Sequence, residues 1–212
     1  MNHRIRLGML TPSSNTVLEP VTSAMLAGLP DVTAHFARFK VTEIALSNDA
    51  RGQFDDTEIL RAAELLAHAK VDVIAWNGTS ASWLGFDRDQ RLCGCITAAT
   101  DIEAVTTTLA CRELLQRRHA KRIGLVTPYL DDVQEKIIAN WGAEGLPVAA
   151  ERHLRIRDNF AFAEIPEDEI ERMVRDVVGE GVDAVVVLCT NMCGARRAPR
   201  LEAELNVPVY DS

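Results

Sequence analysis

The stretch Val71-Asp-Val-Ile-Ala-Trp-Asn-Gly-Thr-Ser80 decides the fold, because a similar stretch, Val182-Asp-Ala-Val-Val-Val-Leu-Cys-Thr-Asn191, follows at an offset of 111 residues. In each copy an apolar run leads into a turn of small polar residues, which is typical of a buried parallel strand. The match places Gly78 and Cys189 at equivalent positions. Such a repeat predicts two similar halves whose strand ends face one cleft.

Two further segments support the repeat. Arg6–Pro12 matches Arg122–Pro128 at an offset of 116, and Cys95–Thr100 aligns with Asn206–Asp211 at an offset of 111. We therefore expect residues 1–105 to form the first half and residues 118–212 the second, with a helix over 102–117 that can cross between them. The second copy stops at Ser212, so we expect the second half to lack its closing helix.

Strands alternating with helices predict an α/β fold of two pseudo-symmetric halves, each a mostly parallel four-stranded sheet flanked by helices. The expected strands are Ile5–Leu10, Val32–Phe39, Val71–Trp76, Arg122–Val126, Val148–Arg155 and Ala184–Leu188. The expected helices are Glu58–Ala69, Ile102–Arg117, Asp131–Trp141 and Pro166–Gly179.

Composition argues against binding to nucleic acid, insertion into a membrane and export. The net charge of −8 argues against nucleic acid, because phosphate binding needs a basic surface. No apolar run approaches the roughly 18 residues of a membrane span, and the N-terminus shows no signal-peptide core. The five cysteines have no disulfide-framework spacing, which favours reduced thiols in the cytoplasm. The sequence leaves open whether the chain is a homo-oligomer.

Four predicted strand ends carry small polar clusters, namely Thr11–Asn15, Asn77–Ser80, Thr127–Tyr129 and Cys189–Asn191. In open parallel sheets, ligands bind beyond the carboxyl ends of the strands. Free amides at a strand-to-helix turn favour an anion. One such cluster alone is explained by helix capping. Four at repeat-related positions favour a cradle for a carboxylate.

Cys189 begins one of these turns, and we expect helix amides to lower the pKa of its thiol. The alternative is a buried structural cysteine, but the place of Cys189 opposite Gly78 favours a functional one. We expect Cys193 to face the following helix and pack against it. Cys93 and Cys95 fall in a segment that is predicted to lead from a loop into a strand.

No cofactor or metal is expected. The four-cysteine spacing is not that of a zinc site, and the chain has no glycine-rich nucleotide motif. None of the five histidines adjoins the polar turns, so we do not expect a histidine-assisted cysteine nucleophile.

The polar motifs resemble those of the aspartate/glutamate racemase superfamily, and within it the maleate isomerase and arylmalonate decarboxylase branch. The similar stretches are Thr11–Pro20, Asn77–Ser80, Thr127–Tyr129, Asp158–Asn159 before Ile165–Pro166, and Cys189–Asn191. The related ectoine-utilisation proteins are similar too. The resemblance implies a cofactor-independent enzyme with a small dicarboxylate in the cleft between its halves.

Racemases and maleate isomerases of this superfamily use two cysteines, one in each half. By the resemblance the second is Cys189, whereas the first falls on Gly78. The decarboxylase branch likewise has glycine there, which favours decarboxylation with Cys189 delivering a proton to an enediolate. Alternatives are a maleate cis-trans isomerase that works by thiolate addition, a racemase-like isomerase, and a non-catalytic protein that binds a diacid.

The resemblance also implies a set of substrate-binding and oxyanion-stabilising residues, with Asn15 and Asn159 orienting the substrate. The departing carboxylate would face the apolar segment Val41–Leu46. Trp76 and Trp83 flank the first turn and are candidates to shape the pocket, with core packing the favoured alternative for Trp76. Arg196 and Arg197 are expected on a solvated face, the alternative being contact with an acidic substrate. The implied binding set is Pro12, Ser14, Asn15, Gly78, Thr79, Ser80, Tyr129, Asn159, Thr190 and Asn191.

Overall fold

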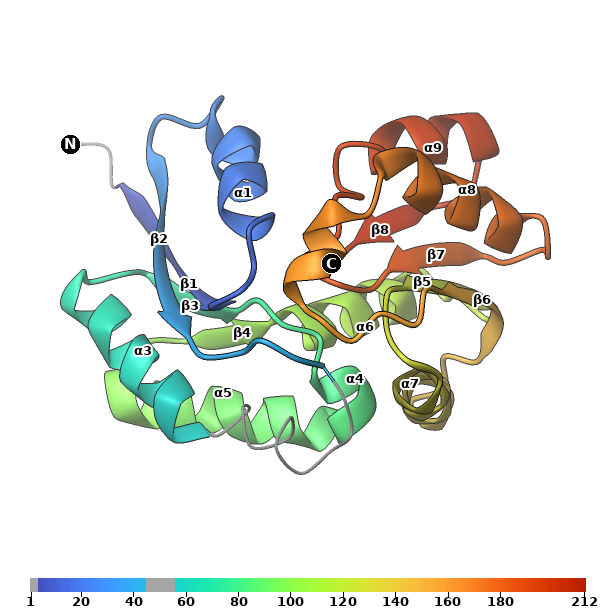
Figure 1. Ribbon diagram of the computed structural model, residues 1–212. Helices are drawn as coiled ribbons and strands as arrows, with labels where there is room; N and C mark the ends of the chain where they lie inside the picture. The colour runs from blue at the N-terminus through green and yellow to red at the C-terminus, as the bar shows by residue number, and fades with distance from the viewer. Residues whose placement is uncertain (1–3, 45–55) are drawn as a thin grey trace.

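The computed structural model describes residues 4–44 and 56–212 and confirms the predicted α/β fold. Each half contains one sheet of four parallel strands, in the order β2-β1-β3-β4 in the first and β6-β5-β7-β8 in the second. The two sheets lie side by side (Figure 1). The strands are β1 Ile5–Pro12, β2 Val32–Phe39, β3 Val73–Trp76, β4 Ala104–Thr106, β5 Ile123–Thr127, β6 Val148–His153, β7 Ala184–Val187 and β8 Val209–Asp211.

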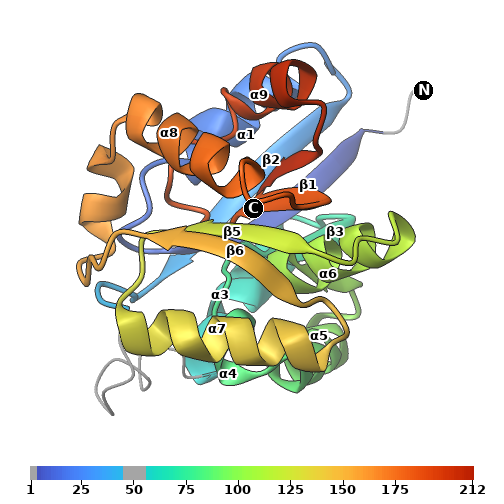
Figure 2. The ribbon, with the colours of Figure 1, turned by 90° about the vertical axis from the view of Figure 1, so that its right-hand side faces the viewer.

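Helices cover both faces of each sheet. In the first half α1 lies on one face and α3 and α5 on the other, and in the second half α7 lies opposite α8 and α9 (Figures 1 and 2). Amphipathic patterning explains this packing, since α8 buries only Ile170, Met173, Val174 and Val177. The helices are α1 Leu18–Leu26, α3 Asp56–His68, α4 Ala81–Leu84, α5 Phe86–Thr100, α6 Thr107–Arg117, α7 Asp131–Ala143, the 3₁₀ turn η1 Phe160–Glu164, α8 Glu167–Val178 and α9 Ala198–Leu205.

The repeat alignment was wrong for the last strand of the first half. Cys95–Thr100 belongs to α5, and β4 begins at Ala104. The expected helix from Ile102 accordingly begins only at Thr107. The physical reason is that Leu92 and Ile96 are both buried on one face of α5, a spacing of four residues that suits a helix. Cys93 and Cys95 are therefore helical residues.

Hydrogen bonds join the two halves around the strand ends. The Asn15 side chain donates to the carbonyl oxygen of Thr190 at 3.1 Å. The backbone N–H of Thr16 donates to Asn191 Oδ1 at 2.9 Å. Farther along the cleft, Ile44 N–H donates to the Arg157 carbonyl at 3.1 Å. The strand ends of both halves are therefore held in one fixed arrangement.

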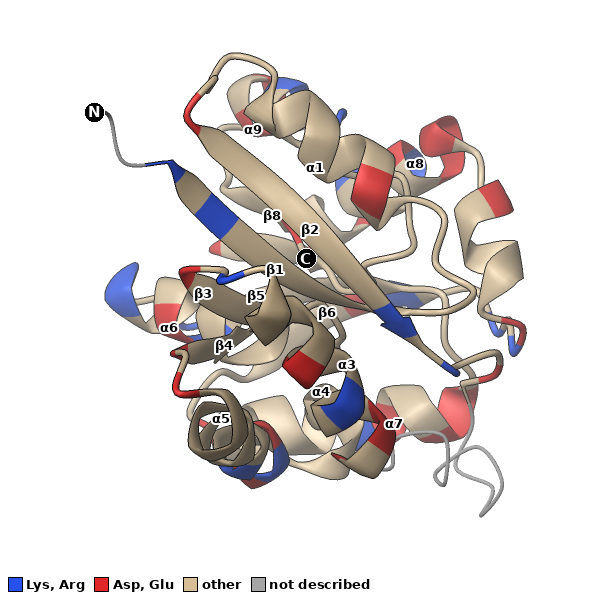
Figure 3. Cartoon of the chain, turned by 90° about the vertical axis from the view of Figure 1, so that its left-hand side faces the viewer, with Lys and Arg blue, Asp and Glu red and all other residues tan. Residues whose placement is uncertain are grey.

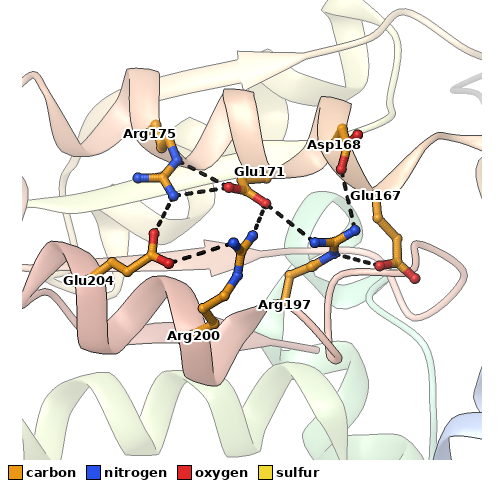
Figure 4. Close-up of polar contacts among 7 residues, drawn as sticks. All are labelled: Glu167, Asp168, Glu171, Arg175, Arg197, Arg200 and Glu204. Atoms are coloured by element: carbon orange, nitrogen blue, oxygen red, sulfur yellow. Dashed lines mark hydrogen bonds and ion pairs between the residues drawn. The ribbon is translucent and has the colours of Figure 1, made fainter.

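Charged residues of both signs are spread over the outer helices, whereas few residues of the strands are charged (Figure 3). Arg197 lies in an ion-pair network between α8 and α9, with its Nε atom 2.6 Å from Glu167 Oε2 (Figure 4). Glu171 of the same network faces Arg175, Arg197 and Arg200. Arg197 thus packs against α8 rather than reaching toward the cleft. Among the described helices, none is long and apolar enough to cross a membrane.

A buried carboxyl group in α5 makes stability depend on pH. Asp89 is fully buried, and burial raises its pKa from 3.8 to about 6, although the Thr106 hydroxyl partly offsets this. Because the folded-state pKa lies above the unfolded one, the protonated carboxyl favours folding below pH 4. This contribution is lost as the pH rises through 6, so the free energy of unfolding is lower by about 3 kcal/mol at pH 7.

We therefore expect Asp89→Asn to raise the free energy of unfolding by about 2–3 kcal/mol at pH 7 and to change it little at pH 3.5. Urea unfolding at the two pH values measures this difference. Asp87→Asn, on the exposed side of the same helix, is the control and should have little effect at either pH. Equal gains at both pH values for Asp89→Asn would contradict the burial argument.

Candidate active site

A small cavity lies where the strand ends of the two halves meet. Its free volume is about 20 Å³, room for about one water molecule, so a diacid needs the lining side chains to rearrange. Within residues 4–44 and 56–212, the lining contains no charged side chain and no histidine. The lining residues are Pro12, Val41, Ile44, Trp76, Gly78, Thr79, Ser80, Trp83, Tyr129, Asn159, Cys189 and Thr190.

Most of the residues in the implied binding set line this cavity, but three lie behind its wall. The Asn15 side-chain oxygen accepts hydrogen bonds from the N–H groups of Val17 and Leu18, and its amide nitrogen donates to Thr190. Ser14 accepts a hydrogen bond from Asn159 at 2.6 Å. Asn191 donates to the Asn159 carbonyl, also at 2.6 Å. These three side chains hold the cavity wall in place.

The Cys189 thiol is buried and neutral. Only 3% of the residue is exposed, and burial raises the pKa of the thiol to about 12. Hydrogen bonds from the Asn191 backbone, Tyr129 and the Met192 backbone lower the pKa in part. Asp211, whose own pKa is raised by burial, raises the pKa of the thiol when its carboxyl group is ionised. The thiol therefore stays protonated at neutral pH.

The expectation of a lowered thiol pKa was thus wrong. It assumed a helix directly after Cys189, but the chain forms a turn in which Met192 N–H donates to the Cys189 carbonyl, and α9 begins only at Ala198. Two backbone N–H groups do not offset the loss of solvent around the sulfur.

A pair of hydroxyl groups, one from each half, lies next to the thiol, and Tyr129 is hydrogen-bonded to Cys189. The oxygen atoms of Thr79 and Tyr129 lie 2.7 Å apart. Burial raises the pKa of Tyr129 well above 10. The charge that Cys189 would carry as a thiolate raises the pKa of Tyr129 further. The rings of Trp83 and Phe162 pack against Tyr129 at centroid distances of 5.1 and 5.7 Å. Tyr129 is therefore a fixed, neutral phenol that can donate a hydrogen bond to a ligand.

Apolar residues close the rest of the cavity. Val41 and Ile44 belong to the Val41–Leu46 segment, of which Ala45 and Leu46 lie outside the described residues. Trp76, for which core packing was expected, is 1% exposed and lines the cavity as well. Its position two residues before Gly78, at the end of a buried strand, is the sequence signal that points to this place.

Cys193 lies outside the cavity. It was expected to pack against a helix, but it follows Cys189 in the same turn and is half-buried. Its Sγ atom lies 3.8 Å from the Ala163 carbonyl oxygen. It lines a separate groove together with Val17 and Arg196. Of the cysteines in the described part of the chain, Cys189 alone lines the cavity.

Comparison with known proteins shows which family the chain belongs to. Residues 7–212 match the family model described as arylmalonate decarboxylase. The maleate isomerase of Pseudomonas putida is 31% identical, over 99% of this chain and 87% of that protein. The arylmalonate decarboxylase of Bordetella bronchiseptica is 27% identical, over 66% of this chain and 60% of that protein.

A solved maleate isomerase from Pseudomonas putida S16 superposes with a TM-score of 0.86 at 25% identity, covering 98% of this chain and 87% of that one. The family match spans nearly the whole chain, including both strand-end turns that form the cavity. The chain belongs to the arylmalonate decarboxylase family.

Proposed function

We propose that this protein is a cofactor-independent decarboxylase that removes carbon dioxide from a malonate-type diacid and protonates the resulting enediolate from Cys189. The observation that carries the proposal is the position of Cys189, whose thiol alone among the described cysteines lines the cavity and is kept protonated by burial, which raises its pKa. Position 78, its counterpart in the repeat, is a glycine and offers no second thiol. The free thiol that the reaction needs is consistent with a cytoplasmic location.

The lining residues divide into a polar and an apolar wall. Thr79, Ser80 and Tyr129 offer hydroxyl groups to the carboxylate that the product retains. Val41 and Ile44 form an apolar surface for the departing carboxylate, where its negative charge is poorly solvated. The substrate carboxylates thus meet two different environments.

When the carbon–carboxylate bond breaks, its electron pair passes into the retained carboxyl group, which becomes an enediolate. Hydroxyl donors placed around that charge stabilise it by a few kcal/mol each. The Cys189 S–H then transfers its proton to the α-carbon, and the thiolate regains a proton from solvent. A single donor protonates one face of the intermediate.

A maleate cis-trans isomerase is the second candidate, favoured by the 31% identity with the Pseudomonas putida enzyme. That reaction would need the Cys189 thiolate to add to the double bond, after which rotation and elimination follow. The described lining holds no histidine or carboxylate to remove the thiol proton. We therefore favour a decarboxylase, in which Cys189 donates a proton, over an isomerase, in which its thiolate adds to the substrate.

Incubation with methylmalonate, phenylmalonate, maleate and aspartate tests the assignment. We expect a malonate to release carbon dioxide, and maleate to give no fumarate. Cys193→Ser, which changes a thiol outside the cavity, should retain the activity within about twofold, as expected for a site away from the chemistry. Conversion of maleate to fumarate without carbon dioxide release would contradict the proposal and support the isomerase.

A further inference from the structure

His153, the last residue of β6, lies between two carboxylate groups of the second half. Its Nε2 atom lies 2.6 Å from Asp131 Oδ1, and its Nδ1 atom lies 2.7 Å from Glu151 Oε2. Only 11% of the His153 side chain is exposed. Its hydrogen bond is the largest of the interactions that lower the pKa of the Asp131 carboxyl group. The imidazole ring is thus held at both of its nitrogen atoms.

These contacts hold the turn that carries Tyr129 at both of its ends. Asp131, two residues after Tyr129, is the first residue of α7. On the other side of Tyr129, the buried Thr127 hydroxyl donates a hydrogen bond to the Gln134 side chain at 2.7 Å. Gln134 in turn donates to Glu151 at 3.0 Å. The imidazole ring therefore connects the start of the turn with its end.

The segment that follows His153 is joined to the same turn through its backbone. The N–H group of Arg155 donates to the Tyr129 carbonyl at 3.1 Å. The N–H group of Ile156 donates to the Pro128 carbonyl at 2.8 Å. The backbone that carries the phenol is therefore tied to the end of β6.

The first half has a basic residue at the equivalent position. Thr127 pairs with His153 in the register of β5 and β6. Its repeat counterpart, Thr11, pairs with Arg38 in the register of β1 and β2. Arg38 donates to two backbone carbonyl oxygens of the Thr11–Asn15 turn, at 3.0 and 2.9 Å. In each half, a basic side chain on an edge strand thus holds the polar turn at the end of the neighbouring strand.

We propose that His153 is a positioning residue, which acts on the reaction through Tyr129. This inference rests on the proposed function, in which the Tyr129 phenol donates a hydrogen bond to the carboxylate that the product retains. The charge on that group rises as the enediolate forms, so a misplaced phenol destabilises the transition state more than the bound substrate. Loss of the His153 ring is therefore expected to lower kcat and to leave KM nearly unchanged.

His153→Ala tests the inference with two measurements. We expect kcat on the best malonate substrate to fall about 10–10²-fold, the cost of a small misplacement in an active site, with KM within about twofold. Amide hydrogen exchange, followed by NMR without any substrate, should speed up about tenfold or more at the Arg155 and Ile156 N–H groups. His153→Gln, which keeps a donor for one carboxylate, should give intermediate values.

Arg152→Ala is the matched control. Arg152 is the neighbouring residue of β6, but its ion pairs are with Asp176 and Glu180, on the α8 side of the sheet. Its loss should leave kcat and both exchange rates within about twofold of the wild type. Asp131→Ala removes one of the two contacts from α7 and should reproduce both effects. Because the Asp131 side chain is 62% exposed, this variant tests the contact even where His153→Ala does not fold.

Unchanged kcat in the folded His153 and Asp131 variants would overturn the inference, and so would unchanged exchange at the two N–H groups. An equal loss of activity in Arg152→Ala would overturn it too, because the effect would then follow from a general loss of stability.

Hydrogen exchange does not require turnover, so the two claims can fail separately. If the wild type decarboxylates no malonate but exchange is faster in the His153 variant alone of the two β6 variants, the proposed function fails and the hold on the Tyr129 turn stands. If a malonate is decarboxylated and the His153 and Asp131 variants keep the wild-type kcat, the proposed function stands and the role of His153 fails.

Discussion

Cys189→Ala is expected to lower kcat for decarboxylation by about 10²–10⁴-fold, the range that a positioned general acid supplies. Cys189 is the one described cysteine that lines the cavity. The described lining contains no charged side chain and no histidine that could transfer a proton in its place. Steady-state kinetics with the best malonate substrate measures the loss.

The fold should survive this change, because alanine removes only one sulfur atom from the interior. We expect the free energy of unfolding to fall by about 1 kcal/mol. Cys193→Ser again serves as the control thiol. Retained activity in Cys189→Ala, with a folded protein, would show that another group delivers the proton.

Gly78→Cys is expected to destabilise the protein by about 3 kcal/mol or more, the upper range for overpacking a core. The new Cβ would lie 2.1 Å from a Trp76 ring that is only 1% exposed. The substitution that would restore a thiol in each half therefore costs stability in this chain. Urea unfolding of the variant measures the loss.

The double variant Gly78→Cys with Trp76→Val should recover most of that stability, since it reproduces the Val187 and Cys189 pair of the second half. A double-mutant cycle isolates the coupling between positions 76 and 78. Losses that simply add would contradict a steric conflict between these two residues.

The sequence predicted the strands next to the cavity because each combines an apolar run with a polar turn. β1, β3, β5 and β7 all lie in segments that the repeat identified. It failed at α5, where the repeat aligned Ala98 and Ala99 with a strand although alanine is a strong helix former. In that segment the four-residue spacing between the buried residues Leu92 and Ile96 indicates a helix.

The electrostatics of the site could not be read from local sequence. The pKa of Cys189 depends on how completely other elements remove solvent, and on Asp211 and Tyr129, which come from different strands and turns. The role of Asn15 likewise depends on Thr190, which lies 175 residues away. Trp76 could be placed near Gly78 from the sequence, but only the three-dimensional packing shows that its ring occupies the position of a side chain at residue 78.

The configuration of the product tests most directly whether one thiol protonates one face of an enediolate. Decarboxylation of ethyl(methyl)malonate gives 2-methylbutanoate, whose new stereocentre is set by the protonation step. Chiral chromatography of the wild-type product should show one enantiomer in large excess. In D₂O the product should carry one deuterium at that carbon. Racemic product from the wild-type enzyme would contradict delivery of the proton by Cys189 from a single side.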